Sequence, residues 1–311
     1  MTPYKALRTR AAFIDLSSRG KIRVTGEDRA RLLHAMSTNH IQQMQPGDGL
    51  YAFFLSAQGR ILADAYVYDL GDSMLLDTEP ETATKLTEHL DKYIIADDVT
   101  LEDETGKWTI FGVEGPESIA LATDLGIAVP EKKYHWLHFG SGFVARTASA
   151  TPDGLRIFLP AGEQSAFLQK LGAADIPEAS AEEARIVRLE NGLPRYGEDI
   201  TERFLVQETQ ALHGVHFSKG CYLGQEIVER VRSRGQVHRL LAPIRIKGSS
   251  IVPPGTKFTT DGANAAEVTS AVFSPALAEV VGLAYVRTEA LQNKPHLVFA
   301  GSEPPLEAYL P

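Results

Sequence analysis

The segment KGCYLGQE, residues 219–226, contains the only cysteine of the 311-residue chain. A single thiol excludes an intramolecular disulfide and a zinc site built from several thiolates. Cys221 can still act as a thiolate that forms a mixed disulfide, carries an adduct or lends one ligand to a shared site. Lys219 and the nearby arginines favour the thiolate, and Gly220 and Gly224 favour an accessible loop. The competing interpretation is a small apolar residue packed in a turn.

Two carboxylates stand where a strand or a helix ordinarily carries another kind of residue. Asp64 lies in LSAQGRILADAYVY, which alternates like a hairpin with its turn at Gln58-Gly59. Glu190 ends the apolar helical stripe of AEEARIVRLE, where the helix dipole disfavours a negative charge. Asp64 either faces solvent or points into a cleft. Glu190 either has a functional role or is simply exposed to solvent.

A basic strip runs from Arg230 to Lys247 without any Asp or Glu, although the whole chain has a net charge of −9. Its members are Arg230, Arg232, Arg234, His238, Arg239, Arg245 and Lys247. Such a strip on an acidic protein indicates either a specific anionic ligand or a solvated hairpin. The negative net charge and the lack of interleaved aromatic residues argue against nucleic-acid binding.

The composition, with 43% hydrophobic and 23% charged residues, is that of an ordinary globular protein, and the length predicts two or three domains. The N-terminal stretch MTPYKALRTRAAFIDLSSRG lacks the apolar core of a secretory signal. No stretch reaches the roughly 18 apolar residues that a membrane span needs. Because a single cysteine also fits a reducing compartment, we expect a cytoplasmic protein without a membrane partner.

The first half of the chain repeats one pattern of elements. IRVTGEDRARLLHAM and IFGVEGPESIALATDLG each read as a strand, a glycine turn and a helix, and each is followed by strands and a second helix. This repeated order of elements predicts a duplicated α+β module with antiparallel sheets, in which residues 13–24 form a first strand. From about residue 238, short β-rich runs separated by Pro, Gly, Ser and Asn predict a small antiparallel barrel or sandwich.

Three longer stretches carry a family resemblance: STNHIQQMQPGDGLYAFFLSAQGRILAD, RLENGLPRYGEDI and KGCYLGQEIVERVRSRGQVHRLL. The first two resemble the glycine-cleavage aminomethyltransferase, the T-protein, in its Pro-Gly turn, its hairpin aspartate and its helix with a following Tyr-Gly turn. The third resembles the signature of one branch of that superfamily. That branch is the folate-binding YgfZ-type proteins, which are linked to iron–sulfur cluster assembly or repair. The resemblance covers nearly the whole chain.

The resemblance implies an α+β fold. Two ferredoxin-like, antiparallel α+β domains and a C-terminal antiparallel β-barrel would form a three-domain ring around a central channel for tetrahydrofolate. We expect residues 1–48 with 106–235 to form the first α+β domain, residues 49–105 the second, and residues 236–311 the barrel. We also expect a monomer.

The resemblance also implies roles for the folate site. Glu190 matches the family position that holds the pterin, and a carboxylate suits its amidine-like edge. Tyr196 would wall the ring, and Asp64 matches the aspartate near the folate N5 and N10 atoms. Asn39 matches a motif amide that either helps to bind or caps a turn. The acidic tail would meet four arginines, Arg230, Arg232, Arg234 and Arg239.

The complete KGCYLGQE signature favours a functional thiol, so Cys221, Lys219 and Asp64 are the candidate catalytic residues. The leading hypothesis is a tetrahydrofolate-binding accessory protein, without a metal of its own, that supports iron–sulfur clusters in client enzymes through Cys221. Its partners would be client proteins or assembly factors. The alternative is a folate-dependent aminomethyltransferase, which Asp64 and Glu190 favour.

Overall fold

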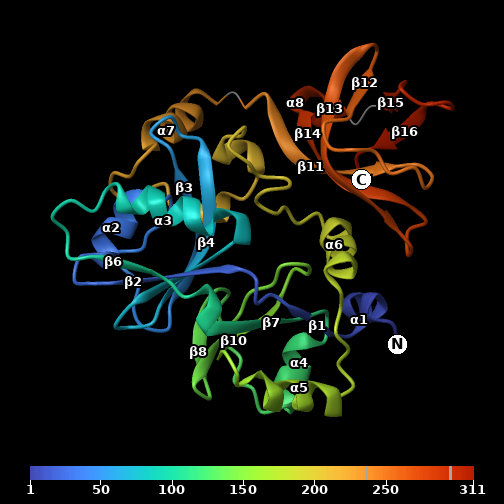
Figure 1. Cartoon of the computed structure of the whole chain (residues 1–311). Coiled ribbons are helices and arrows are strands. Elements are labelled where there is room, and N and C mark those ends of the chain that lie inside the picture. The colour runs from blue at the N-terminus through green and yellow to red at the C-terminus, as the bar shows by residue number, and fades with distance from the viewer. Residues whose placement is uncertain (236, 294–295) are drawn as a thin grey trace.

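The computed structural model describes residues 1–235, 237–293 and 296–311, apart from the side chain of Arg234. It contains two antiparallel five-stranded sheets with helices and a closed C-terminal barrel, so the predicted fold class is confirmed. Figure 1 shows the barrel in orange and red, apart from the two sheet units in blue to green. No helix in the described part of the chain is long and apolar enough to cross a membrane.

The first sheet unit follows the predicted hairpin. Its strands, in spatial order, are β3 (Gly49–Leu55), β4 (Ile61–Asp69), β5 (Met74–Thr78), β2 (Gly20–Thr25) and β6 (Thr100–Asp103). Helices α2 (Arg29–Met36) and α3 (Ala83–Asp91) cover one face and share its buried core. Gly59 has φ +71° in the turn between β3 and β4, which explains why a glycine is needed there.

The second sheet unit has the order β8 (Trp136–Phe139), β9 (Gly142–Ala145), β10 (Gly154–Pro160), β7 (Trp108–Glu114) and β1 (Ala12–Asp15). Helices α4 (Ser118–Asp124) and α5 (Gln164–Ala173) belong to this unit. The order matches the first unit strand for strand, so the predicted duplication is confirmed. The two units differ in where their fifth strand lies in the chain. Strand β6 comes after the other strands of its sheet, whereas β1 comes before the other strands of its sheet.

The chain crosses between the two units at residues 16–19. Residues 13–24 were expected to form one strand, but β1 and β2 are separate strands in different sheets. The predicted domain boundary placed residues 1–48 in one domain with residues 106–235, and β2 falls within residues 1–48. In the structure, however, β2 pairs with β5 and β6. Residues 20–25 therefore lie in the sheet of residues 49–103. A local alternation pattern shows that a segment is extended, but it does not show which strand becomes its partner.

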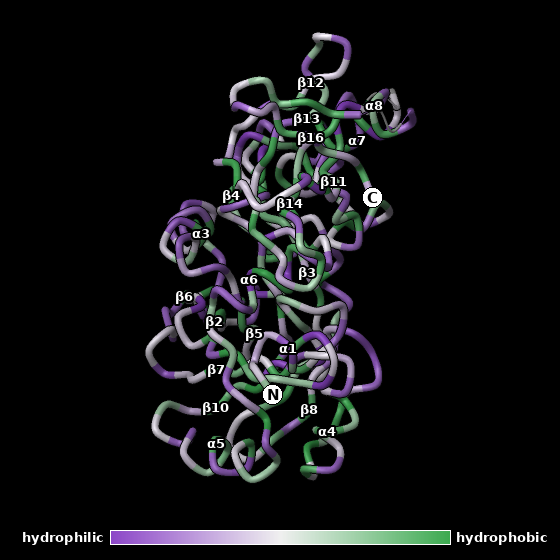
Figure 2. The backbone as a smooth tube through the Cα atoms, turned by 90° about the vertical axis from the view of Figure 1, so that its right-hand side faces the viewer, coloured by the Kyte–Doolittle hydropathy of each residue, from purple (hydrophilic) through white to green (hydrophobic). Residues whose placement is uncertain are grey.

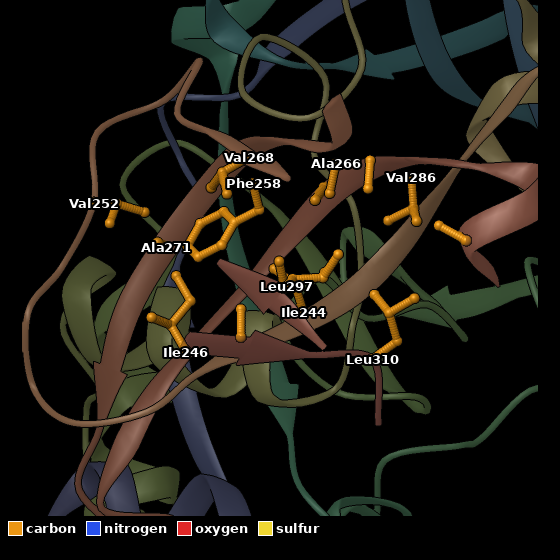
Figure 3. Packing of buried hydrophobic residues seen from close by; sticks show 14 of the residues in the cluster. Ile244, Ile246, Val252, Phe258, Ala266, Val268, Ala271, Val286, Leu297 and Leu310 are labelled. Carbon is orange, nitrogen blue, oxygen red and sulfur yellow. The ribbon is translucent and has the colours of Figure 1, made fainter. Parts of the chain in front are cut away.

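The barrel closes through six strands: β11 (Arg239–Ile246), β14 (Glu279–Arg287), β13 (Ala263–Ser274), β12 (Lys257–Thr260), β15 (Leu297–Phe299) and β16 (Leu306–Tyr309). Helix α8 (Thr288–Asn293) follows β14. Figure 3 shows Phe258, Ile244 and Leu297 in the barrel interior, where all three are fully buried. Closure leaves no unpaired sheet edge among these strands.

Helix α6 (Ala181–Glu190) connects the sheet units to the barrel, and Figures 1 and 2 both place it between them. Ser180 and Glu183 form a capping box at its start, and Gly192, with φ +66°, follows its end. The buried carboxylate of Asp199 fixes the barrel to the following turn. It accepts hydrogen bonds from Thr269 Oγ1 at 2.7 Å and Ser270 Oγ at 2.5 Å.

Two further helices lie outside the two sheet units and the barrel. Helix α1 (Pro3–Thr9) packs on α6. Helix α7 (Gln225–Arg234) starts directly after KGCYLGQE's second glycine, Gly224, which has φ +83°. The first part of the basic strip is therefore a helix rather than part of a hairpin, although Arg230 and Arg232 are exposed as the solvated alternative expects.

Candidate functional site

A cavity of about 690 Å³ lies between the two sheet units and α6. Its walls come from the crossing at residues 14–19, from β4 and the end of β5, from loops 133–134 and 147–152, and from residues 181–198. Among the described residues, none from the barrel lines it. The barrel contributes indirectly, because Asp199 holds the turn that carries the lining residues Tyr196 to Glu198.

Asp64 lines this cavity and is 8% exposed, so the cleft interpretation of this carboxylate is the correct one. The hydroxyl of Tyr51 donates to Asp64 Oδ2 at 2.6 Å. Burial, with the nearby charge of Glu79, raises the pKa of Asp64 to about 7. A carboxyl group with this pKa can both accept and donate a proton near neutral pH.

A group of buried and half-buried ions lies next to the cavity, and three of its members, Arg19, Glu79 and Arg195, line it together with Asp64. Arg19 Nε donates to Asp77 Oδ1 at 2.6 Å, and Arg195 Nε pairs with Glu79 Oε2 at 2.8 Å. Arg156 of β10 also pairs with Asp77, so this contact joins the two sheet units. Burial alone would raise the pKa of Asp77, but Arg156 and Arg19 outweigh it and hold that pKa below its usual range.

Aromatic rings form one wall. The centroids of Tyr51 and Tyr66 are 5.3 Å apart, those of Tyr66 and Tyr134 5.8 Å, and those of Tyr51 and His213 5.2 Å. All four residues line the cavity. This wall suits a flat heteroaromatic ligand. The sequence analysis missed these residues, although Tyr66 lies two positions after Asp64 and therefore on the same face of β4.

Two other predicted residues lie at or next to the cavity. Tyr196 lines it and donates its hydroxyl to the carbonyl oxygens of Ile61 at 3.1 Å and Leu62 at 2.5 Å. Asn39 does not line it. Its Nδ2 instead donates to the carbonyl oxygens of Tyr51 at 2.8 Å and His213 at 3.2 Å. Asn39 therefore holds two wall residues in place rather than contacting a ligand.

A buried glutamate, Glu114, orders another wall. Its carboxylate accepts the backbone N–H groups of Ser149 at 2.8 Å, Ala150 at 2.7 Å and Thr151 at 3.0 Å, all of which line the cavity. Gly112 leaves it room, because a Cβ atom there would lie 3.0 Å from Glu114 Oε1. The signal in the sequence was a glutamate at the end of the apolar strand IFGVE.

Glu190 does not line the cavity, which corrects the prediction that it holds a ligand together with Asp64. Its carboxylate accepts hydrogen bonds from Tyr4 at 2.5 Å, Arg8 at 2.8 Å and Ser274 at 2.6 Å. The cavity-facing positions of α6 are 181, 184, 185 and 188, which share one helix face. Position 190 lies on another face and joins α1 to the barrel.

Three of the predicted arginines, Arg230, Arg232 and Arg239, do not line the cavity either. Arg230 and Arg232 are exposed on α7, and the side chain of Arg234 lies outside the described residues. Arg239 donates to Glu208 at 2.7 Å. The described arginines of α7 and β11 therefore do not reach the cavity that Asp64 lines.

Other cations occupy the cavity walls. The four lining arginines, Arg19, Arg185, Arg188 and Arg195, are each paired with a carboxylate. Lys133 is an exposed lining residue, and no carboxylate in the described part of the chain pairs with it. It is therefore available to an acidic group of a ligand.

Lys219 is buried, and Cys221 is exposed. The ammonium of Lys219 donates to the carbonyl oxygens of Ser37 at 2.7 Å and Asn39 at 2.8 Å, and also to that of His34. Burial lowers the pKa of Lys219 to about 7. This lysine anchors the loop to the end of α2, so it acts as a structural residue, and neither it nor Cys221 lines the cavity.

Three histidines meet beneath the same loop. The ring centroids of His34 and His40 are 4.7 Å apart, and those of His40 and His216 are 5.2 Å apart. Burial, then Lys219 and the other two histidines, lowers the pKa of His34 to about 4. Nowhere in residues 1–235, 237–293 and 296–311 are three or more His, Cys, Asp or Glu side chains placed to hold a metal ion.

Comparison with known proteins identifies relatives across the whole chain. Residues 2–219 match the model of the GCVT N-terminal domain, and residues 239–300 match that of the glycine cleavage T-protein C-terminal barrel domain. An aminomethyltransferase of Rubrobacter xylanophilus is 29% identical over 294 residues, which are 92% of this chain and 78% of that protein. An aminomethyltransferase of Rippkaea orientalis is 26% identical over 303 residues, 91% of this chain and 80% of that protein.

A solved structure has the same fold. The crystal structure of glycine cleavage system aminomethyltransferase T from Bartonella henselae superposes with a TM-score of 0.86. The match covers 99% of this chain and 87% of that chain, at 19% sequence identity.

Acid should destabilise the protein through His34. Its folded pKa of about 4 lies below the ordinary 6.5, so the unfolded chain binds the proton more tightly between these values. The contribution of a neutral His34 to stability is complete above pH 6.5 and is lost as the pH falls toward 4. Urea unfolding from pH 7.5 to 4.5 measures this loss. His34→Gln should flatten the pH dependence, whereas the exposed control His138→Gln should retain it; equal slopes would contradict the assignment.

Proposed function

Since the chain belongs to the glycine cleavage T-protein family, we propose that the Asp64 cavity binds a tetrahydrofolate. The observation that carries the proposal is Asp64 itself, a buried carboxyl group with a raised pKa beside a wall of tyrosines. Folate presents an amidine-like pterin edge, an aromatic p-aminobenzoate and an acidic tail. The cavity offers a carboxylate, aromatic rings and an unpaired lysine, so the chemistry of its residues fits each part.

Asp64 is the group that would meet the pterin or its reduced ring nitrogens. Tyr51 donates to Oδ2, so Oδ1 is the oxygen left for a ligand. A carboxylate at this place would stabilise positive charge on a bound amine or move a proton to or from it. When bound, tetrahydrofolate would supply a one-carbon acceptor. Asn39 and Glu114 would keep the surrounding walls in position.

For the biological role we propose an accessory protein of the YgfZ type, which supports iron–sulfur clusters in client proteins. KGCYLGQE supports this role, because it presents Cys221 on an exposed loop held by Lys219. A thiol away from the cavity would act on a protein partner rather than on the folate. We also propose that the protein works as a monomer in the cytoplasm.

The second candidate function is aminomethyl transfer to tetrahydrofolate. Asp64 favours it, because a carboxyl group with a pKa of about 7 in the cavity is suited to proton transfer. The aminomethyltransferases named above are similar over most of their length.

Asp64→Asn should weaken tetrahydrofolate binding about tenfold or more, because the amide keeps the size of the side chain but loses the charged acceptor. Anaerobic calorimetric titration measures the affinity. Glu190→Gln is the matched control, since Glu190 is a carboxylate outside the cavity. We expect it to retain folate affinity while its thermal stability falls. Loss of affinity in Glu190→Gln with none in Asp64→Asn would reverse the two assignments.

Lys133→Ala should remove most of any preference for folates with longer γ-glutamate tails. Lys133 is the lining cation without a described carboxylate partner, so its charge is free to attract the tail. The ratio of the dissociation constants for the mono- and triglutamate forms measures this effect. Lys132→Ala, an exposed neighbour that does not line the cavity, should leave the ratio unchanged. An unaltered ratio in Lys133→Ala would place the tail elsewhere.

Cys221→Ala separates the two functions. The accessory role predicts that this variant binds tetrahydrofolate normally but no longer restores the activity of iron–sulfur enzymes in cells lacking the wild-type protein. Aminomethyl transfer predicts rapid methylene-tetrahydrofolate formation from an aminomethyl donor, which Cys221→Ala leaves intact and Asp64→Asn abolishes. Ser218→Ala, on the same loop, is the control for the cellular assay.

A further inference from the structure

A second cavity, of about 810 Å³, lies between the segment that leads into the barrel and the barrel itself. It shares no lining residue with the Asp64 cavity. Two members of the basic strip, His238 and Arg239, line it. The strip indicated a specific anionic ligand, and the proposed folate site does not use it.

Strand register places the charged side chains of this cavity on one face of the barrel. Arg239 of β11 lies directly opposite Arg287 of β14. Glu267 of β13 lies opposite both Tyr285 of β14 and Lys257 of β12. Directly opposed residues of antiparallel strands project from the same face, about 5 Å apart at Cβ. Like charges opposed in this way are destabilising, and here Glu208 pairs with Arg239 but not with Arg287.

The charges within the cavity are only partly compensated. Arg239 pairs with Glu208, and Glu267 pairs with Arg203, each at 2.7 to 2.8 Å. Arg287 and Lys257 line the cavity and form no ion pair among the described residues, although Glu267 lies opposite Lys257 in the strand register. Glu289 is the lining carboxylate that has no described cation. The cavity lining thus holds three cations, Arg239, Lys257 and Arg287, against two carboxylates, Glu267 and Glu289, so its surplus charge is positive.

Arg239 is held in a fixed position. Its guanidinium lies 5.0 Å from the ring centroid of Phe204 and 5.4 Å from that of Tyr285, in addition to its contact with Glu208. The two rings stack on each other at 3.6 Å. Among its described lining residues, the cavity offers no tyrosine, phenylalanine or tryptophan ring open to a ligand, because Phe204 and Arg239 lie against the ring of Tyr285. It is therefore suited to charge recognition rather than to stacking a nucleobase.

We propose that this second cavity binds a small multivalent oxyanion, with Arg287 and Lys257 as its principal contacts and Arg239 at the edge. Clustered phosphate groups and clustered carboxylates share the chemistry that these cations recognise. The bound anion would offset the repulsion between Arg239 and Arg287 and would join β11, β12 and β14. The proposal is independent of folate binding in the Asp64 cavity.

Calorimetric titration of the full-length protein with pyrophosphate, and separately with citrate, tests the site. At least one of the two anions should bind and raise the thermal unfolding temperature, and the preferred one distinguishes a phosphate from a carboxylate ligand. Arg287→Gln and Lys257→Gln should each weaken binding about tenfold. Both positions are exposed, so the variants should fold normally, which thermal unfolding without added anion verifies.

Arg232→Gln is the matched control, because Arg232 is an exposed arginine outside the cavity. It should bind the anion like the wild type, as should Asp64→Asn. If neither anion binds, or if Arg232→Gln weakens binding as much as Arg287→Gln does, the proposed site is wrong and the attraction is only a diffuse effect of surface charge.

Discussion

The buried carboxylate of Asp77 is the contact on which the arrangement of the two sheet units depends. It receives Arg19 from the crossing between the units and Arg156 from the second sheet. Taking such ions out of water is costly, and only complete pairing offsets the cost. The pairing requires both sheets to meet in one orientation, and the Asp64 cavity forms where they meet. Packing of apolar side chains alone would allow the two similar units more freedom.

The same group of ions gives three neighbouring carboxylates, Asp64, Asp77 and Glu79, different pKa shifts and therefore different roles. Asp77 and Glu79 each have arginine partners, which outweigh burial and hold their pKa values below the ordinary range. Asp64 is also buried, but among the described residues its carboxylate accepts a hydrogen bond only from the Tyr51 hydroxyl and pairs with no arginine, so burial and the charge of Glu79 raise its pKa. The ion-paired carboxylates stabilise the structure, and the one without an arginine partner is left to bind a ligand or exchange a proton.

Glu190 and the basic strip have different structural roles from those that the family resemblance implied. Glu190 connects α1, α6 and the barrel through Tyr4, Arg8 and Ser274. In the basic strip, Arg230 and Arg232 are exposed on α7, and His238 and Arg239 line the second cavity. Arg245 and Lys247 form ion pairs with Glu279 and Glu307 of the barrel. In both cases the residue type was noticed correctly, but its surroundings depend on segments far away in the chain. Helix phase and strand register decide which cavity a side chain reaches.

The sequence by itself determined the elements and their repetition, because hydrophobic periodicity and glycine turns act within one segment. It identified the hairpin that carries Asp64, the helix that ends at Glu190 and the β-rich character of the last part of the chain. Tertiary structure decided that β1 and β2 belong to different sheets and which tyrosines surround Asp64. It also decided that the ammonium of Lys219 donates its hydrogen bonds to backbone carbonyl oxygens. These outcomes depend on contacts between residues that are distant in the chain, and no local pattern encodes the partner of a strand or of a buried charge.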